Sequence, residues 1–275
     1  MSDTFRQKLA TASRTNNSLL CVGLDPDRAL MPRVDLTNFV KQIIEATQDL
    51  ACCYKPNLAF FEALGAEGLD ALAKTVGFAR DAGIPVIGDS KREDIGNTSR
   101  LYASRLFDTL GFDAVTVNPY MGYDSVSPFL DYKDRGVIIL CRTSNPGAAD
   151  FQLQTVVSDG RQMPLFELAA RTALKWDQHG NIGLVVGATD ASAITSVRRI
   201  CPAMPLLVPG VGPQAGELEA SVRAGVDASG GNVMINSSRQ VLYASREADF
   251  AQASRRAAQE LRDKINAART PVPRG

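Results

Sequence analysis

Short apolar runs rich in β-forming residues recur along the chain, and a longer helical pattern follows each of them. The runs read SLLCVGLD (18–25), ACCYKPN (51–57), IPVIGDSK (84–91), DAVTVNP (113–119), GVIILCRT (136–143), IGLVVGAT (182–189), PLLVPGVG (205–212) and NVMINSS (232–238). Nearly continuous Val, Ile and Leu content is typical of strands covered on both faces, as in a parallel sheet packed beneath helices. Eight strand–helix units in one chain of this length predict a (β/α)8 TIM barrel of the α/β class.

The segments between these runs carry apolar residues at every third or fourth position, which is the spacing of an amphipathic helix. Clear examples are VDLTNFVKQIIEATQDL, EGLDALAKTVGFARDAG and MPLFELAARTALKWDQHG. A doubly wound open sheet is the competing architecture, but it needs fewer strands or a second domain. No linker-like change of composition divides the chain, so we expect residues 1–275 to form a single barrel domain.

The two ends of the chain are expected to lie outside the barrel repeat. Phe5 and Leu9, four residues apart behind Ser2 and Asp3, predict a capped amphipathic helix rather than a transit peptide. The last residues, AARTPVPRG, are expected to form a frayed tail.

Composition and charge narrow the range of partners and compartments. Thirty basic and thirty acidic residues cancel, which gives no reason to expect binding to nucleic acid or to an anionic membrane. No stretch approaches the roughly 20 apolar residues that span a bilayer, and the start lacks the apolar run of a signal peptide. The five cysteines lie mostly in apolar runs and lack metal-binding spacing, which predicts reduced buried thiols, no metal site and a cytoplasmic protein.

In (β/α)8 barrels the chemistry takes place at the carboxyl ends of the strands. Polar residues and glycines occupy these positions here: Asp25, Lys55, Asp89 with Lys91, Asn118, Thr143 with Ser144, Gly187, Gly210 with Gly212, and Arg239. Polar side chains at the ends of so many apolar strands indicate a functional site rather than scattered surface groups.

The charged stretch GDSKREDIGNT (88–98) directly follows an apolar run. Asp89 and Lys91 are two residues apart, so in a strand they point to the same face, which at the mouth of a barrel is the interior. Lys55 ends another strand and is expected nearby. Two ammonium groups within about 4–6 Å keep a carboxylate ionised at neutral pH. An ion-pair network that only closes the top of the barrel is the alternative interpretation.

Two strand-to-helix connections have the composition of phosphate-binding loops. PGVGPQAGELEASVRAG passes through glycines and Gln214, and NSSRQVLYA carries Ser238 and Arg239. The loops after strands 7 and 8 of these barrels frequently hold a phosphate on backbone N–H groups at the start of a helix. Arg239 adds a forked guanidinium that is always charged, so we expect a substrate that carries a phosphate.

Five motifs, CVGLDPD, KPNLAFFE, GDSKREDIGNT, TSNPGA and NSSRQVLYAS, occur along the chain. Together they resemble the signatures of the orotidine 5′-phosphate decarboxylase family, from about Leu20 to about Ser245. The D-x-K-x-x-D-I core is shared with a wider group of barrels, so specificity comes from its combination with GLD and KP. The resemblance implies decarboxylation of orotidine 5′-phosphate to uridine 5′-phosphate, in de novo pyrimidine biosynthesis, without metal or cofactor, by a homodimer with shared active sites.

The resemblance also implies a role for each matching residue. The implied catalytic residues are Lys55, Asp89, Lys91 and Asp94. The implied substrate-binding residues are Asp25, Ile95, Thr98, Ser144, Gln214, Ser238 and Arg239. Lys91 would deliver a proton to C6 of the pyrimidine, Asp89 would lie against the substrate carboxylate, and Lys55 would bridge Asp89 and the ribose.

Among the binding residues, Asp25 would bind a ribose hydroxyl and Ser144 the pyrimidine. The 5′-phosphate would be held by Gln214, the Ser238 backbone and Arg239, whereas Asp94, Ile95 and Thr98 would reach the site of a second subunit. The chain departs from the common family pattern at Ala215 and Ser238, where relatives often have glycine.

Residues 143–160 form the longest non-helical stretch after a predicted strand. Long loops in compact domains are often lids, and Pro146 with Gly147 are expected to act as its hinge. Two other functions stay open: a magnesium-dependent keto-sugar-phosphate decarboxylase or aldol enzyme, which needs further carboxylates, and a non-catalytic nucleotide-binding barrel. Schiff-base chemistry at Lys55 or Lys91 is disfavoured, because flanking carboxylates keep a lysine protonated.

Overall fold

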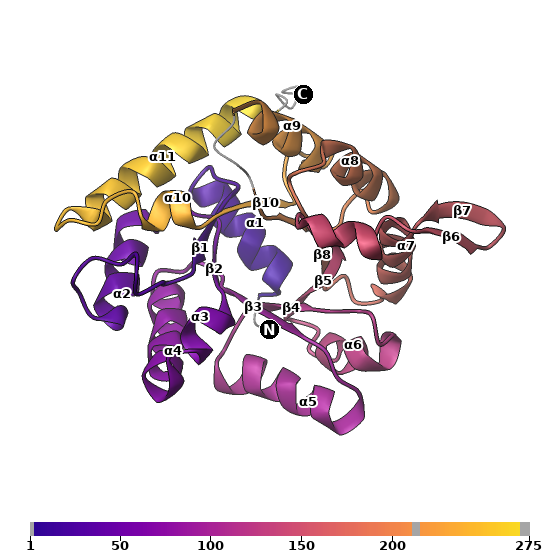
Figure 1. Ribbon diagram of the computed structural model, residues 1–275, viewed down its shortest axis with the longest axis horizontal. Coiled ribbons are helices and arrows are strands. Elements are labelled where there is room, and N and C mark those ends of the chain that lie inside the picture. Colours follow the sequence, from indigo (N-terminus) through magenta and orange to yellow (C-terminus); the bar gives the residue numbers. More distant parts are fainter. Residues whose placement is uncertain (1–2, 211–214, 270–275) are drawn as a thin grey trace.

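The computed structural model describes residues 3–210 and 215–269, and its strands form the predicted barrel (Figure 1). Eight parallel strands lie side by side in the order β2-β1-β10-β9-β8-β5-β4-β3. Parallel bridges from Tyr54 to Val86 and from Asn57 to Asp89 connect the two outermost strands of this order. The sheet is thereby nearly closed on itself, which confirms the (β/α)8 TIM barrel.

The strands are short and coincide with the predicted apolar runs. Their bounds are β1 Leu20–Leu24, β2 Cys53–Pro56, β3 Ile87–Arg92, β4 Ala114–Val117, β5 Gly136–Arg142, β8 Ile182–Val186, β9 Leu206–Val208 and β10 Val233–Ser237. Seven of the eight predicted runs extend past the carboxyl ends of their strands, because they include the polar residues that leave the sheet there; the run 84–91 instead stops one residue before the end of β3.

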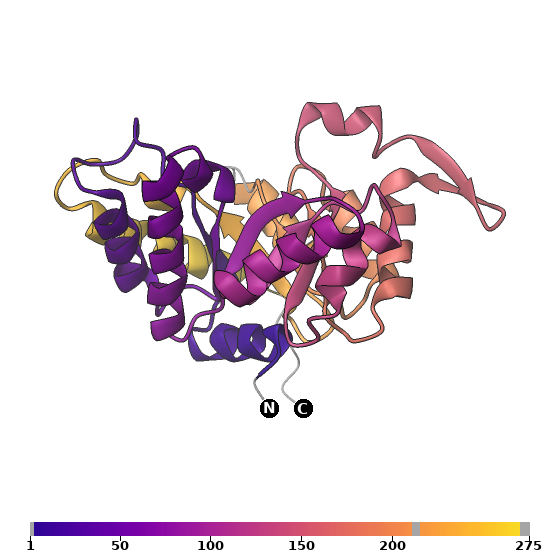
Figure 2. The same cartoon turned by 90° about the horizontal axis from the view of Figure 1, so that it is seen from below.

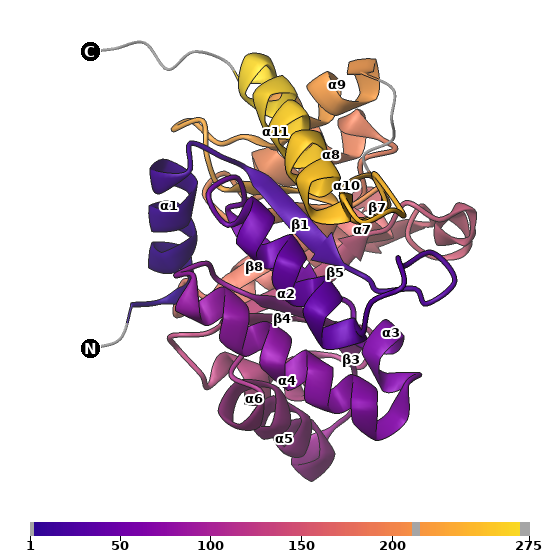
Figure 3. The ribbon, with the colours of Figure 1, turned by 90° about the vertical axis from the view of Figure 1, so that its left-hand side faces the viewer.

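Helices surround the sheet. Their bounds are α1 Phe5–Thr15, α2 Leu36–Thr47, α3 Leu58–Glu62, α4 Gly65–Asp81, α5 Gly96–Ser104, α6 Tyr123–Leu130, α7 Leu165–Trp176, α8 Ala191–Ile200, α9 Ala215–Gly225, α10 Arg239–Leu242 and α11 Phe250–Ala268. A π-helical turn, Arg105–Thr109, continues α5. The C-terminal helix α11 packs against both α2 and α9 and so completes the outer ring (Figure 3).

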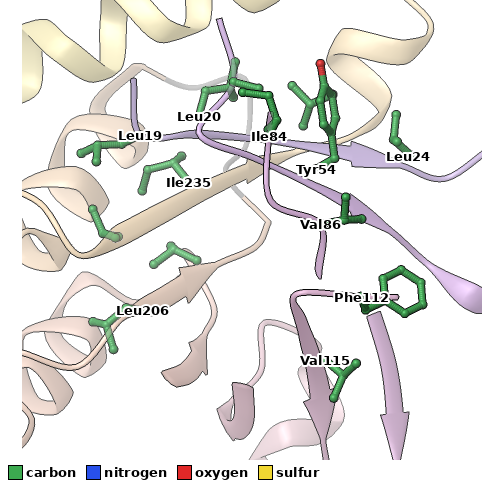
Figure 4. Packing of buried hydrophobic residues seen from close by; sticks show 14 of the residues in the cluster. Leu19, Leu20, Leu24, Tyr54, Ile84, Val86, Phe112, Val115, Leu206 and Ile235 are labelled. Carbon is green, nitrogen blue, oxygen red and sulfur yellow. The ribbon is translucent and has the colours of Figure 1, made fainter. Parts of the chain in front are cut away.

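Alternate residues along each strand serve two separate layers of the core. Cys21 and Ile138 face the barrel interior, where they pack with one residue from each of the other strands. Their neighbours in sequence, such as Val22 and Ile139, face outward into the layer between sheet and helices. Figure 4 shows part of this outer layer, including Tyr54 from β2. Both faces of the sheet are therefore buried, which explains the nearly continuous apolar character of the runs.

The N-terminal helix α1 closes the amino-terminal end of the barrel (Figure 2). Phe5 and Leu9 are buried against the interior residues, as their spacing predicts. Lys8 Nζ binds Asp113 Oδ1 at 2.6 Å and ties the helix to the start of β4. The helix is capped, as predicted, but the capping residue is Thr4, which forms a capping box with Gln7.

Residues 143–160 contain more structure than the long loop predicted from the sequence. A 3₁₀ turn, Pro146–Asp150, is followed by a β-hairpin made of β6 Thr155–Ser158 and β7 Arg161–Pro164, which projects from the barrel (Figures 1 and 2). Asp159 and Gly160 connect the strands with φ of +50° and +73°. The Asp-Gly pair is a strong hairpin signal, because both turn residues need positive φ.

Other expectations about the chain as a whole have mixed outcomes. All five cysteines are buried free thiols, as predicted. None of the helices within residues 3–210 and 215–269 is long and apolar enough to cross a membrane. The expected frayed tail began too early, since α11 continues to Ala268, and residues 270–275 lie outside the described part of the chain.

Candidate active site

Lys55, Asp89 and Lys91 meet at the carboxyl ends of β2 and β3. Lys55 Nζ lies 2.8 Å from Asp89 Oδ2, and Lys91 Nζ contacts the other carboxylate oxygen, Oδ1. Only 4% of the Lys55 side chain and 9% of the Asp89 side chain are exposed, whereas 46% of the Lys91 side chain is exposed. The three residues thus form a charged row with one buried end and one accessible ammonium.

Asp89 and Lys91 are in contact, as predicted, but a regular strand is not what brings them together. β3 does not run regularly here, because its register against β4 shifts between Gly88 and Arg92. Lys91 itself has a φ of +44°, in the left-handed region. The Lys91 side chain therefore reaches Asp89 from a bulge and not from a regular strand.

The charges of this row stabilise each other. Burial favours the neutral acid at Asp89, but the ammonium groups of Lys55 and Lys91 outweigh it and hold the pKa of Asp89 well below its usual value. Burial likewise disfavours the Lys55 ammonium, yet the carboxylates of Asp89 and Asp25 outweigh it and raise the pKa of Lys55. Asp89 and Lys55 are consequently both charged at neutral pH, which makes Schiff-base formation at Lys55 unfavourable.

A cleft of ≈ 510 Å³ opens between the ends of β1, β9 and β10 and the helix α10. Its lining residues are Asp25, Asp27, Leu30, Phe60, Gly210, Asn236, Ser237, Ser238, Arg239, Gln240 and Tyr243. One carboxylate oxygen of Asp25 is buried and has no hydrogen-bond partner within the described residues. A buried acceptor of this kind fits a ligand that donates a hydrogen bond, such as a hydroxyl.

Tyr243 connects the two sides of this cleft. Its hydroxyl donates to the Asp25 carbonyl oxygen at 2.7 Å and accepts from the Asp27 N–H at 2.6 Å. Its ring stacks on Phe39, with centroids 6.2 Å apart. Tyr243 lies four residues after Arg239, so one short helical segment positions both the guanidinium and the β1 loop.

Close packing joins the predicted Ser238 to β1. A Cβ atom placed on Gly23 would lie 1.9 Å from Ser238 Oγ and 2.9 Å from Ser238 Cβ. Glycine at position 23 is therefore what allows a serine to precede Arg239.

The remaining predicted residues fall into three groups. Ser144 lies beside the cleft, since a Cβ on Gly210 would be 3.1 Å from Ser144 Oγ. Asp94, Ile95 and Thr98 follow β3, and no contact of the described chain brings them into its own cleft. The Asp94 carboxylate accepts from the Ile95 N–H at 2.8 Å. Gln214 lies outside the described residues.

Several residues of the site were missed in the sequence analysis. Asp27, Asn236, Gln240 and Tyr243 line the cleft, and Thr116 donates a hydrogen bond to Asp89 Oδ1 at 3.0 Å. Alternation along β4 from the interior-facing Ala114 could have placed Thr116 inside the barrel. Tyr243 could have been found from its i, i+4 spacing to Arg239.

Within residues 3–210 and 215–269, no three or more His, Cys, Asp or Glu side chains are grouped so that they could hold a metal ion. The charged row itself alternates carboxylate and ammonium, and ammonium groups oppose cation binding.

Comparison with known proteins identifies the family. Residues 18–254 match the model of the orotidine 5′-phosphate decarboxylase / HUMPS family. The chain is 50% identical over 273 residues to the orotidine 5′-phosphate decarboxylase of Cupriavidus necator, with 96% of this chain and 98% of the relative covered. The chain belongs to this family. The match confirms the resemblance inferred from the five motifs, and the matched segment contains every predicted site residue.

Other members of the orotidine 5′-phosphate decarboxylase family agree in sequence and in fold. The enzyme of that name from Roseiflexus castenholzii is 51% identical over 271 residues, covering 96% of this chain and 98% of the relative. The solved structure of Leishmania donovani OMP decarboxylase superimposes with a TM-score of 0.83 at 42% identity, covering 96% of this chain and 98% of the other. The barrel described above is therefore the fold of an established decarboxylase relative.

Proposed function

We propose that this protein decarboxylates orotidine 5′-phosphate to uridine 5′-phosphate, a step of de novo pyrimidine biosynthesis. The observation that carries the proposal is the charged Lys55–Asp89–Lys91 row, with its accessible Lys91 ammonium, together with a cleft that holds Asp25 and Arg239. This arrangement sits in a chain about half identical to enzymes that are named for this reaction.

The reaction requires charged groups that stabilise the negative charge formed on C6, and it requires no nucleophile that bonds to the substrate. The C6–carboxylate bond breaks, CO2 leaves, and the electron pair stays on C6 until a proton replaces it. The partly exposed Lys91 ammonium would stabilise the developing negative charge and then transfer its proton to C6. Ionised Asp89 would lie against the substrate carboxylate and hold Lys91 in place, while solvent returns the proton to Lys91.

Binding of the nucleotide would use the cleft. Asp25, with its buried unpartnered oxygen, would accept from a ribose hydroxyl, and Lys55 would bridge the ribose and Asp89. Arg239, the Ser238 N–H and Gln214 would hold the 5′-phosphate. Phosphate binding, remote from C6, would supply binding energy for closing the site.

Ser144 and the segment after it would cover the pyrimidine. Ser144 would hydrogen-bond the ring, and residues 143–160 would close over it as a lid. Gln152 supports this role, because it ties the segment back to Thr143 through the Thr143 N–H at 2.7 Å and the Thr143 hydroxyl at 2.8 Å. In this proposal the turn Pro146–Asp150, which lies between these two residues, would move as one unit about the end of β5.

A homodimer would complete the site. Asp94, Ile95 and Thr98 follow β3 on the outside of their own cleft, which suits residues that reach into a neighbouring subunit. Ile95 is itself exposed, and so is Leu101 further along α5. Exposed Met121 lies close by, because its N–H donates to Glu93 at 2.8 Å, and the exposed rings of Tyr120 and Phe151 pack against each other. A second copy of the chain would bury this surface, and in a two-fold dimer the same surface serves both subunits.

An absorbance assay with orotidine 5′-phosphate, with and without a chelator, tests the function. The wild-type protein should convert the substrate at the same rate in both conditions, and Lys91→Ala should abolish turnover while it still binds uridine 5′-phosphate. Activity that is lost in EDTA and restored by magnesium would favour the magnesium-dependent alternative. Nucleotide binding without any turnover by the wild type would favour the non-catalytic barrel.

A further inference from the structure

Strand β3 is irregular where it passes Thr116 of β4. The register of the two strands shifts over residues 88–92, so that three residues of β3, 89–91, lie opposite this one residue. The last of the three, Lys91, has a φ of +44°. Left-handed backbone is disfavoured for residues with a side chain, and it persists where the surroundings hold it in place.

The Thr116 side chain provides that hold. The residue is 1% exposed, and its hydroxyl oxygen accepts from the Lys91 N–H at 2.9 Å. The same hydroxyl donates to Asp89 Oδ1 at 3.0 Å. An ionised carboxylate only accepts hydrogen bonds, so the direction of both bonds is fixed.

The Thr116 backbone adds a further contact to the bulge. Its carbonyl oxygen accepts from the Ser90 hydroxyl at 2.9 Å. All three bulged residues are therefore tied to one residue of β4, two of them through the threonine hydroxyl. Asp89 Oδ1 receives both this hydroxyl and the Lys91 ammonium, which sets the orientation of the carboxylate relative to the ammonium.

We propose that Thr116 is a positioning residue for the decarboxylation, acting through Lys91 and Asp89. Its hydroxyl holds Lys91 in the left-handed conformation and orients the Asp89 carboxylate, and together these aim the ammonium at the carbon that loses CO2. This inference rests on the proposed function, because it assigns Thr116 a role in that reaction. A displacement of about 1 Å in a reacting group can cost about 100-fold in rate.

Steady-state kinetics of three variants test the proposal. Thr116→Val keeps the shape and removes the hydroxyl, so kcat should fall about 10- to 100-fold, while KM should change by less than about 3-fold because the nucleotide-binding residues are untouched. Thr116→Ser keeps the hydroxyl and should retain kcat within about 3-fold of the wild type. Thr75→Val is the matched control, because it removes a buried hydroxyl that donates to Ala71 O at 2.7 Å in α4; it should leave kcat unchanged.

Crystal structures of the variants give a readout that does not depend on turnover. In Thr116→Val, Lys91 should leave the left-handed region and its ammonium should move away from Asp89, whereas Thr116→Ser should keep both features. An unchanged Lys91 and Asp89 in Thr116→Val, or an equal loss of kcat in Thr116→Ser, would overturn the proposal. If Thr116→Val does not fold, Thr116→Ala removes the hydroxyl without placing a methyl group against the bulge and replaces it in both measurements.

The two proposals fail in distinguishable ways. A wild-type protein without activity on orotidine 5′-phosphate would overturn the proposed function and, with it, the role of Thr116 in that reaction. The crystal structures would still show whether Thr116 holds Lys91. Normal wild-type activity with unchanged kcat in Thr116→Val would overturn only the positioning role.

Discussion

At the scale of single residues, Asp89 decides the electrostatics of the site. It accepts from Lys55, Lys91 and Thr116, so its carboxylate is the common partner of two cations and one hydroxyl. Without Asp89, two ammonium groups would face each other, one of them on the nearly fully buried Lys55. A buried ion pair that loses one partner typically costs about 3–5 kcal/mol.

Replacement of this carboxylate should therefore destabilise the protein in a pH-dependent way. Asp89→Asn should lower the free energy of unfolding at pH 7 by about 3–5 kcal/mol. Because the folded pKa of Asp89 is depressed, its contribution is complete above the unfolded pKa of about 4 and is lost as the pH falls below that value. The difference between variant and wild type should accordingly shrink between about pH 4 and pH 2.

Urea unfolding of both proteins at several pH values measures this difference. Asp70→Asn is the control, since it removes an exposed carboxylate that pairs with Lys74 on α4, and it should leave stability nearly unchanged. A constant difference between Asp89→Asn and wild type over the whole pH range would show that Asp89 is not the ionised partner of Lys55.

At the scale of elements, the site depends on how closely neighbouring strands approach. β1 and β10 are paired strands, and Ser238, directly after β10, occupies the space that a side chain at position 23 of β1 would need. Tyr243 of the following segment then binds the backbone of the β1 loop. The ends of β1 and β10 are therefore held together, with the proposed ribose-binding Asp25 on one side and the proposed phosphate-binding Arg239 on the other.

This contact predicts a rescue experiment. Gly23→Ala should destabilise the protein by about 1–3 kcal/mol and lower kcat/KM, because the new methyl group would lie 2.9 Å from Ser238 Cβ whatever the rotamer of the hydroxyl. Ser238→Gly alone should have a small effect, and the double variant Gly23→Ala/Ser238→Gly should recover most of the lost stability and activity. Thermal unfolding and initial rates of the four proteins measure this coupling.

The double variant can also contradict the prediction that a side chain at position 23 and Ser238 compete for the same space. If its losses equal the sum of the two single losses, the strand and the serine do not compete for the same space. The alanine at position 23 would then act through another neighbour.

At the scale of the whole molecule, the barrel brings most of the proposed site together in one chain but leaves Asp94 outside it. Lys55, Asp89 and Lys91 are in contact, and Asp25 and Arg239 line one cleft. Asp94 lies beyond the end of β3, the strand that carries Asp89 and Lys91, and the exposed Ile95 follows it directly. In the proposed dimer, each subunit would contribute its Asp94 to the site of the other subunit, so that every site would contain all the proposed residues.

Mixing two inactive variants tests the shared site. Lys91→Ala and Asp94→Ala should each be nearly inactive alone. Random exchange makes about half of the dimers mixed, and one of the two sites in each mixed dimer combines intact Lys91 with intact Asp94. About a quarter of all sites should therefore regain activity. If verified subunit exchange restores none, both residues belong to the site of a single chain.

The sequence predicted the architecture because its signals are local and repeated. Each strand of a barrel with both faces covered reads as an apolar run, and each carboxyl end carries its own polar residues, so the spacing predicted the barrel and the presence of Lys55, Asp89 and Lys91 at one end of it. The motif resemblance then gave the family, which the comparisons confirm. The β6–β7 hairpin was not predicted, although it also has a local sequence signal, the Asp159–Gly160 turn.

Only the tertiary structure decided the features that depend on the register between strands distant in sequence. The bulge at Lys91, the Thr116 hydroxyl beneath it and the fit of Ser238 against Gly23 each join residues from 25 to more than 200 positions apart. Local spacing fixes which face a side chain points to, but not which residue of the neighbouring strand lies opposite it. That register is set by the packing of the closed barrel as a whole, and the hydrogen bonds that orient Asp89 and Lys91 depend on it.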